Sequence, residues 1–147
     1  VRFRPNASEP LRLAVRGQHI ERWKLLRSSY AEGRQGYLEW RRDQGRAHAD
    51  RVAEIMAEAG YPAEDCARAA RIVRKEGIKR DAEAQVLEDV ACLVFMRWYF
   101  ADFAEGRDRA HLFHIVQRTA RKMSAEGRAV VAAEFDLPAD LAPALED

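Results

Sequence analysis

Four polar side chains lie in helical patterns where they could act on a ligand: His19, His48, Glu76 and Asp89. Side chains of these types build metal sites and acid–base sites when they project from facing helices of a bundle. No two of them have the short spacing of a pair on one helix face, so the fold must bring them together. We expect all four as catalytic residues, and His19, His48 and Asp89 as candidate metal ligands. The alternative for each residue alone is a capping or surface role.

A cationic group surrounds the first of these histidines in the sequence. We expect Arg22, Arg27 and Lys75 to bind an anion, with Trp23 and Tyr30 beside them. A guanidinium can form two parallel hydrogen bonds to a phosphate or a carboxylate, and aromatic rings can stack on a base or another ring. The wider group adds further arginines and aromatic residues, namely Arg16, Lys24, Arg34, Arg41, Arg42, Tyr37 and Trp40. The alternative is a solvated surface of a chain that uses arginine throughout.

The composition limits the classes of protein to consider. The chain has 147 residues, 33% of them charged and 48% hydrophobic, which argues against a disordered, collagen-like or coiled-coil protein. Lys and Arg number 25 and Asp and Glu 24, so the net charge of +1 gives no overall attraction to nucleic acids or membranes. Alanine, arginine, glutamate and leucine dominate, and Thr119 is the single threonine. This composition favours helix over sheet.

Cysteine usage and the absence of targeting patterns indicate a cytoplasmic location. Cys66 and Cys92 lie far apart in helical apolar patterns, where cysteine is usually a small buried hydrophobic residue. The longest apolar run, Val90 to Met96, is far shorter than a membrane span. The N-terminus has neither an apolar signal region nor an initiator methionine, so we expect a fragment or a trimmed chain.

Caps and apolar periodicity predict one all-α domain over residues 8–135, a compact helix bundle with an N-terminal tail at 1–7 and a C-terminal tail at 136–147. A loop is expected over 24–36. The predicted helices span residues 8–23, 37–59, 61–77, 81–104, 108–123 and, after Gly127, a short stretch to 135. Ser8 is the expected N-cap of the first helix, and Gly60, Gly77 and Gly106 are expected to end the second, third and fourth.

Two of these helices carry the predicted core. The fourth is the most apolar and is expected at the centre of the bundle, with its inner face formed by Val90, Leu93, Val94 and Trp98. The second has a thinner apolar stripe, formed by Leu38, Val52, Ile55, Met56 and Ala59.

Several ungapped blocks of the sequence resemble an uncharacterised family known as domain of unknown function 4202. The resemblance covers roughly residues 8–125, and members of that family usually carry a further N-terminal helical segment. It implies no established activity. The blocks are Gln18-His19-Ile20-x-Arg22-Trp23, Arg27-Ser28-Ser29-Tyr30, Gly36-Tyr37-Leu38-x-Trp40-Arg41, His48-Ala49, Lys75-Glu76, the run from Glu88 to Phe95, and Lys122-Met123-Ser124.

A weaker resemblance is to the HD-domain phosphohydrolases, which are all-α and bind divalent metals through histidine and aspartate. It implies an HD-like bundle in which His19, His48 and Asp89 occupy metal positions. Ile20 stands where that family has an aspartate, and Lys75 where another histidine is often found. The resemblance therefore implies that a divalent metal is not bound tightly, and that the cation of Lys75 can hold a phosphate in its place.

These observations lead to one expected function and one alternative. We expect an HD-like helical protein that binds a small phosphorylated or carboxylated ligand, with a divergent phosphohydrolase as the enzymatic form of that function. The alternative is a non-catalytic interaction or dimerisation module whose aromatic helix faces pack on a partner protein or a second copy. The expected partner is a small anionic ligand, with no membrane and no nucleic acid; a homodimer is the further expectation.

Overall fold

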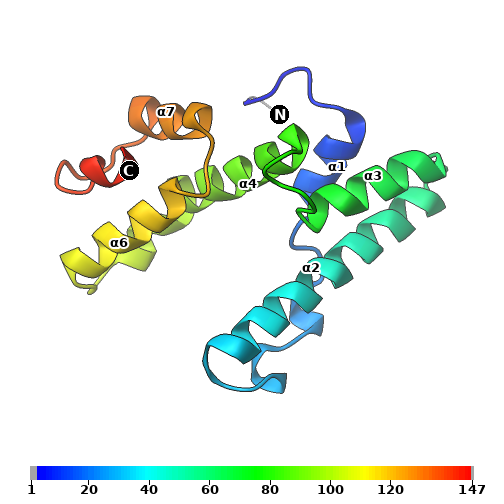
Figure 1. The fold of residues 1–147 in the computed structure, drawn as a ribbon, viewed down its shortest axis with the longest axis horizontal. Helices are drawn as coiled ribbons and strands as arrows, with labels where there is room; N and C mark the ends of the chain where they lie inside the picture. The colour runs from blue at the N-terminus through cyan, green and yellow to red at the C-terminus, as the bar shows by residue number, and fades with distance from the viewer. Residues whose placement is uncertain (1–2, 147) are drawn as a thin grey trace. The chain divides into compact units, whose positions relative to one another are not determined.

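The computed structural model describes residues 3–146, and within them the chain has seven α-helices and no strand (Figure 1). The predicted all-α class is confirmed. The chain divides into two compact units, unit 1 (Val1–Leu87) and unit 2 (Glu88–Asp147), and α4 (Ala82–Val94) continues across the boundary. The predicted domain limits of 8 and 135 stay a prediction. None of the helices in the described residues has the length and apolarity that a membrane span requires.

Unit 1 is built on α1 (Glu9–Gly17), α2 (Gly33–Glu58) and α3 (Ala63–Val73), which pack against one another (Figure 1). Ser8 caps α1 as expected, since its Oγ accepts a hydrogen bond from the amide of Leu11 at 3.2 Å. The α2 helix ends where Gly60 adopts a positive φ of 86°, again as the sequence predicts.

The first helix is shorter than predicted: α1 ends at Gly17, and this last residue lies close to α2. A Cβ atom on Gly17 would lie 2.3 Å from Cγ2 of Val52, so only glycine allows this approach. The chain then leaves the helix through turns at residues 18–21 and a 3₁₀ turn at Arg22–Lys24. His19 therefore lies in a turn and not in a helix.

The predicted loop at 24–36 is smaller and more ordered than expected. It contains a second 3₁₀ turn at Arg27–Ser29, and α2 begins at Gly33 instead of Tyr37. Gly36 sits against the carbonyl of Ala31, where a Cβ atom would lie 1.9 Å from the oxygen. This contact lets the loop fold back onto the first turn of α2.

The buried face of α2 differs from the predicted apolar stripe. Leu38, Ile55 and Ala59 are exposed. The buried face instead follows a spacing of four residues and includes polar side chains, namely Trp40, Gln44, His48, Val52 and Met56. Val52 and Met56 are thus buried as predicted, whereas Gln44 and His48 were missed because the prediction counted only apolar residues as candidates for burial.

The third helix ends at Val73, before the predicted end at Gly77. Lys75 adopts the left-handed conformation with φ of 56°, and the amides of Lys75 and Glu76 bond back to the carbonyls of Ile72 and Arg71. This is the Schellman arrangement that closes a helix, with lysine at the position that glycine usually occupies. Residues 76–81 then lead to α4.

The start of α4 is fixed by a charged network. Oδ1 of Asp81 accepts hydrogen bonds from the amides of Glu83 and Ala84, and Arg68 binds Asp81 through both terminal nitrogens. The guanidinium of Arg68 and these amides lower the pKa of Asp81 to about 2. The network ties α3 to the N-terminus of α4.

Unit 2 contains the remainder of α4, a π-helical segment (Phe95–Tyr99), α5 (Phe100–Ala104), α6 (Arg109–Ala120) and α7 (Ala125–Glu134). The segment predicted as the fourth helix is thus helical throughout, but residues Phe95–Tyr99 form a π-helical turn, which is wider than an α-helical turn. Leu93 is buried as predicted, and Val90 and Val94 are half-buried. Trp98 was predicted to be buried and is 66% exposed, because the π-helical segment adds a residue to the turn and shifts the side chains after Val94 around the axis.

The segment predicted as a C-terminal tail has packed structure over its described residues. Leu141, Ala144 and Leu145 are buried, and the 3₁₀ turn Ala142–Leu145 contacts α6 and α7. Arg109 of α6 forms a two-pronged ion pair with Asp140. The C-terminal residues therefore complete the core of unit 2.

Candidate functional site

Three buried side chains on α2 donate hydrogen bonds to the backbone of the turns that carry His19 and Arg22. Trp40 Nε1 donates to the carbonyl of Leu25 at 2.9 Å, and Gln44 Nε2 donates to the carbonyls of Leu25 and Arg22, both at 2.9 Å. His48 Nδ1 lies 2.6 Å from the carbonyl oxygen of Ile20. We call Trp40, Gln44 and His48 the donor row, and residues 18–25 the cluster loop.

The donor row has a clear structural purpose. The cluster loop is irregular, so its carbonyls lack helical partners, and an unpaired carbonyl facing the interior is costly. Donors spaced four residues apart lie on one face of α2 and can therefore follow the loop along its length. The result is a loop whose backbone is held in place while several of its side chains point outward.

His19 and His48 form a pair within unit 1. Their ring centroids are 6.1 Å apart, in an edge-to-face arrangement of 69°. Because a carbonyl oxygen only accepts hydrogen bonds, the bond to Ile20 places the proton of neutral His48 on Nδ1. The structure thus brings together two of the predicted catalytic histidines.

The pKa of each histidine lies below its ordinary value of 6.5. Desolvation is the main cause for His19, and the positive charges of Arg22, His48, Lys75 and Arg41 add to it. Desolvation is also the main cause for His48, with a further contribution from Arg22 that the bond to Ile20 partly opposes. Both imidazoles are therefore mainly neutral at pH 7.

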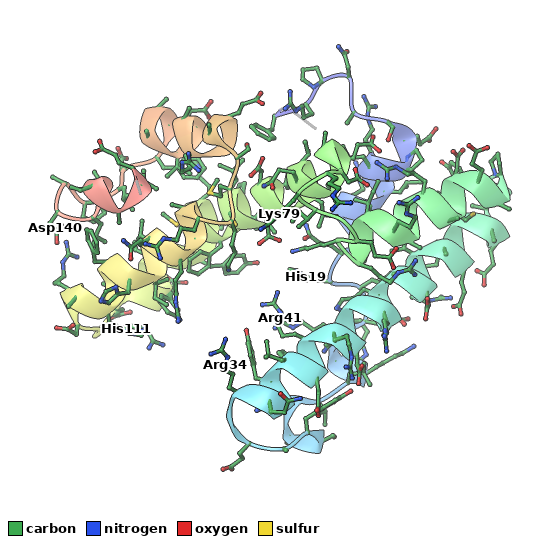
Figure 2. All side chains as sticks on the ribbon, viewed as in Figure 1. His19, Arg34, Arg41, Lys79, His111 and Asp140 are labelled. Atoms are coloured by element: carbon green, nitrogen blue, oxygen red, sulfur yellow. The ribbon has the colours of Figure 1, made fainter. Side chains whose placement is uncertain are left out.

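Three cations from separate parts of the chain act electrostatically on His19. Arg22 belongs to the cluster loop, Arg41 to α2, and Lys75 to the turn after α3, and each lies close enough to lower the pKa of His19. Figure 2 shows His19 and Arg41 on the same side of unit 1. We call His19, Arg22, Arg41 and Lys75 the histidine–arginine cluster.

Aromatic rings support the two arginines of this cluster. The Arg22 guanidinium lies 5.3 Å from the ring centre of Trp40, and that of Arg41 lies 5.9 Å from the ring centre of Tyr37. The two rings are themselves 6.0 Å apart. Arg41 also donates to the Tyr37 hydroxyl at 3.3 Å. Cation–π contacts of this kind position a guanidinium without neutralising its charge.

The acidic residue nearest in sequence to Arg22 is engaged elsewhere. Glu21 pairs with Lys24 at 2.7 Å and with Arg51 at 3.6 Å. Within residues 3–146, neither Arg22 nor Arg41 forms an ion pair with a carboxylate. Their charges are therefore available to an external anion.

Arg27 and Tyr30, predicted to bind ligand, form local hydrogen bonds near the start of α2. Arg27 donates to three carbonyls of its own loop, those of Tyr30, Ala31 and Gly33, at 3.2, 2.9 and 3.4 Å. Tyr30 donates its hydroxyl to Asp43 at 3.1 Å, and desolvation together with that carboxylate raises its pKa. Both residues hold the chain before α2.

Glu76 and Trp23 take positions on the surface of unit 1. Glu76 pairs with Arg74 at 2.6 Å and with Arg71 at 3.9 Å, so its carboxylate is occupied by arginines of its own turn and helix. Trp23 is 72% exposed. The structure thus gives Glu76 an ion-pairing position and presents the indole of Trp23 to solvent.

Asp89, the remaining predicted catalytic residue, belongs to unit 2. Its side chain is buried and accepts hydrogen bonds from both the amide and the hydroxyl of Ser124, each at 2.7 Å. The same hydroxyl caps α7 by accepting from the amide of Gly127 at 3.0 Å. These contacts give Asp89 a part in fixing the start of α7.

The candidate metal ligands do not form a recognisable metal site. Across residues 3–146, no group of three or more histidine, cysteine, aspartate and glutamate side chains has an arrangement that could hold a metal ion. His19 and His48 are close together, but the other cluster members are cations. Cations oppose a dication and suit an anion.

Two contributors to the site were absent from the predicted site residues. Gln44 was not predicted because a single glutamine does not indicate any particular chemistry. Its spacing of four residues from both Trp40 and His48 was the available signal. Arg41 was one of many arginines in the wider cationic group, and only the packing of α2 distinguishes it from its neighbour Arg42, which binds Asp43 at 3.3 Å.

The comparisons with known proteins identify a family and nothing beyond it. Neither the curated proteins nor the solved structures include a match to the chain. The family model described as Domain of unknown function (DUF4202) matches residues 1–145, nearly the whole sequence. The blocks around His19, Arg22, Trp40 and His48 thus lie inside the matched region, and the chain belongs to the DUF4202 family.

Proposed function

We propose that the chain binds a small phosphorylated or carboxylated ligand at the histidine–arginine cluster of unit 1. The observation that carries this proposal is the donor row. Three buried polar side chains are used to hold one irregular loop, and that loop presents His19 and Arg22. Such preorganisation reduces the entropy lost when a ligand binds.

The charge of the cluster supports an anionic ligand. Arg22, Arg41 and Lys75 repel one another and also disfavour protonation of His19. An anion placed among them would relieve this repulsion and gain charge-assisted hydrogen bonds. The planar guanidinium forks of the two arginines suit phosphate and carboxylate oxygens.

Backbone conformation adds an independent observation. Within the described residues, only two residues other than glycine have a positive φ: Glu21 at 53° and Lys75 at 56°. The first directly precedes Arg22 and the second is itself a cluster member. Such conformations cost free energy and concentrate at functional sites.

Hydrolysis of a bound phosphate ester is the enzymatic form of this proposal, as in an HD-like phosphohydrolase. Neutral His19 can accept a proton from an attacking water, while Arg22 and Arg41 balance the charge that develops on the phosphoryl oxygens. The lowered pKa of His19 keeps it in the required form at pH 7.

The proposal is tested by titrating the four histidines by NMR with and without inorganic phosphate or acetate. A bound anion stabilises the imidazolium, so the pKa of His19 should rise when either anion binds. His111 and His114 lie exposed in unit 2 and serve as internal controls. An unchanged His19 titration at saturating concentrations of both anions would contradict the proposal.

Matched variants assign the effect to the cluster. Arg22→Gln and Arg41→Gln should each abolish the anion-induced rise of the His19 pKa. Arg46→Gln removes the same charge from α2 but about 140° around the helix from Arg41, so it should leave the response intact. An equal loss in all three variants would indicate non-specific charge effects and not a site.

A second candidate function is a dimerisation module, favoured by exposed aromatic residues in unit 2. Trp98 and Tyr99 are 66% and 61% exposed and lie in the π-helical segment. Large exposed aromatics are enriched in protein interfaces. Sedimentation across a range of concentrations should then give a dimer that Trp98→Ala weakens. A monomer at all concentrations would contradict the dimerisation function and would not bear on the anion-binding proposal.

A further inference from the structure

The cluster loop carries an aromatic residue that the anion site does not use. Trp23 directly follows Arg22 in the 3₁₀ turn Arg22–Lys24, and 72% of it is exposed. The backbone carbonyls on both sides of it are held, since Gln44 binds those of Arg22 and Leu25 and Trp40 also binds that of Leu25. An exposed indole on so constrained a backbone is a preorganised flat surface.

The placement of this surface relates it to the cluster. Adjacent residues of a 3₁₀ turn direct their side chains about 120° apart around the axis, but their Cα atoms are only about 3.8 Å apart, a span that a ligand larger than a bare phosphate can bridge. A ligand with its anionic group at Arg22 can therefore place an adjoining part against Trp23. Arg22 itself rests on Trp40, so its guanidinium is positioned independently of the Trp23 ring.

From this arrangement we infer that the ligand is a nucleoside monophosphate or a similar phosphate with a planar heteroaromatic ring, and that the ring stacks on Trp23. This inference rests on the proposed function and specifies its ligand class. Every nucleobase has a π face, so stacking on an indole contributes affinity without selecting one base. The phosphate supplies a negative charge for Arg22 and Arg41, which form no ion pair with a carboxylate in the described residues.

The test compares ligands that share a phosphate but differ in the ring. AMP and ribose 5-phosphate are titrated by calorimetry into the full chain and into Trp23→Ala, Trp23→Phe and Trp98→Ala. In the unmodified protein, AMP should bind about fivefold or more tightly than ribose 5-phosphate, the range that base–aromatic stacking supplies. Trp23→Ala should reduce AMP affinity to that of ribose 5-phosphate and leave ribose 5-phosphate unchanged.

The control variants exclude indirect effects. Trp23→Phe keeps an aromatic ring and should retain most of the preference for AMP. Trp98→Ala removes a comparably exposed tryptophan from unit 2 and should change neither affinity. Because Trp23 is exposed, its replacement leaves the core intact, and circular dichroism of each variant checks that the fold is unchanged.

The outcomes separate this inference from the proposed function. Equal affinity for AMP and ribose 5-phosphate, or a preference that survives Trp23→Ala, would overturn the stacking inference while anion binding stands. Binding of neither compound would reject the proposed function itself and the inference with it. Tighter binding of a short single-stranded oligonucleotide than of AMP would assign the surface to a nucleic-acid strand and overturn a free nucleotide as the ligand.

Discussion

His48 donates a hydrogen bond from Nδ1 to the carbonyl oxygen of Ile20 at 2.6 Å, and this bond joins the buried face of α2 to the turn that carries His19. His48 thus acts on the candidate site through the backbone. Its own ring is buried and lies edge-on to the ring of His19.

Removing the His48 side chain should destabilise unit 1. His48→Ala leaves a cavity and deprives the Ile20 carbonyl of its donor, and a lost buried hydrogen bond costs about 1–3 kcal/mol. Urea denaturation followed by circular dichroism measures the change in the free energy of unfolding. His111→Ala removes an exposed imidazole and should cost far less. Equal losses in the two variants would show that the bond to Ile20 contributes little.

The stability of unit 1 should fall as the solution becomes acidic. The folded-state pKa of His48 lies below 6.5, mainly through desolvation, so the unfolded chain binds more protons as the pH drops below 6.5. The stabilising contribution is complete above that pH and is lost as the pH falls through the folded-state pKa. His48→Gln keeps an N–H donor but cannot take up this proton.

The measurement is the free energy of unfolding between about pH 7 and about pH 5. Its slope should be shallower in His48→Gln than in the unmodified chain. His114→Gln removes an exposed histidine of unit 2 and should leave the slope unchanged. An identical slope in the His48 variant would contradict the assigned direction of the pKa change.

Lys75 should show a trade-off between stability and ligand binding. It occupies a left-handed position that favours glycine, so Lys75→Gly should be more stable than Lys75→Ala by about 1 kcal/mol. Both variants lose the same charge and should lose phosphate affinity equally. Thermal denaturation and phosphate titration of the pair separate the two effects. A more stable alanine variant would contradict the role assigned to the backbone.

The N-cap of α7 should contribute more to the free energy of unfolding than an exposed serine cap does. Ser124→Ala removes the acceptor for the Gly127 amide and one donor to the buried carboxylate of Asp89, so we expect a loss of about 1–3 kcal/mol. Ser8→Ala removes the exposed cap of α1 together with the hydroxyl's bond to the solvent-exposed carboxylate of Glu83, and it should cost about 1 kcal/mol. Chemical denaturation of the two variants compares them directly. A larger loss for Ser8→Ala would show that the Asp89–Ser124 contact does not add stability.

The sequence by itself determined the features that depend on local interactions. Helix-forming composition, the N-cap candidate Ser8 and the predicted helix start at Asp108 indicated an all-α chain with helix starts close to those observed. Gly60 and Gly106 marked chain reversals because positive φ is inexpensive only for glycine. The sequence also indicated His19, His48 and Arg22 as candidate site residues, because few residue types can bind an anion or transfer a proton.

Only the tertiary structure decided which of these residues act together. Gly17, the last residue of α1, lies against Val52 of α2, and no local pattern contains that contact. Arg27 and Arg22 are equivalent by type, yet Arg27 donates to nearby carbonyls while the guanidinium of Arg22 rests on the ring of Trp40. Which partner a charged side chain binds depends on the distant segments that lie near it, and these are known only once the helices have packed.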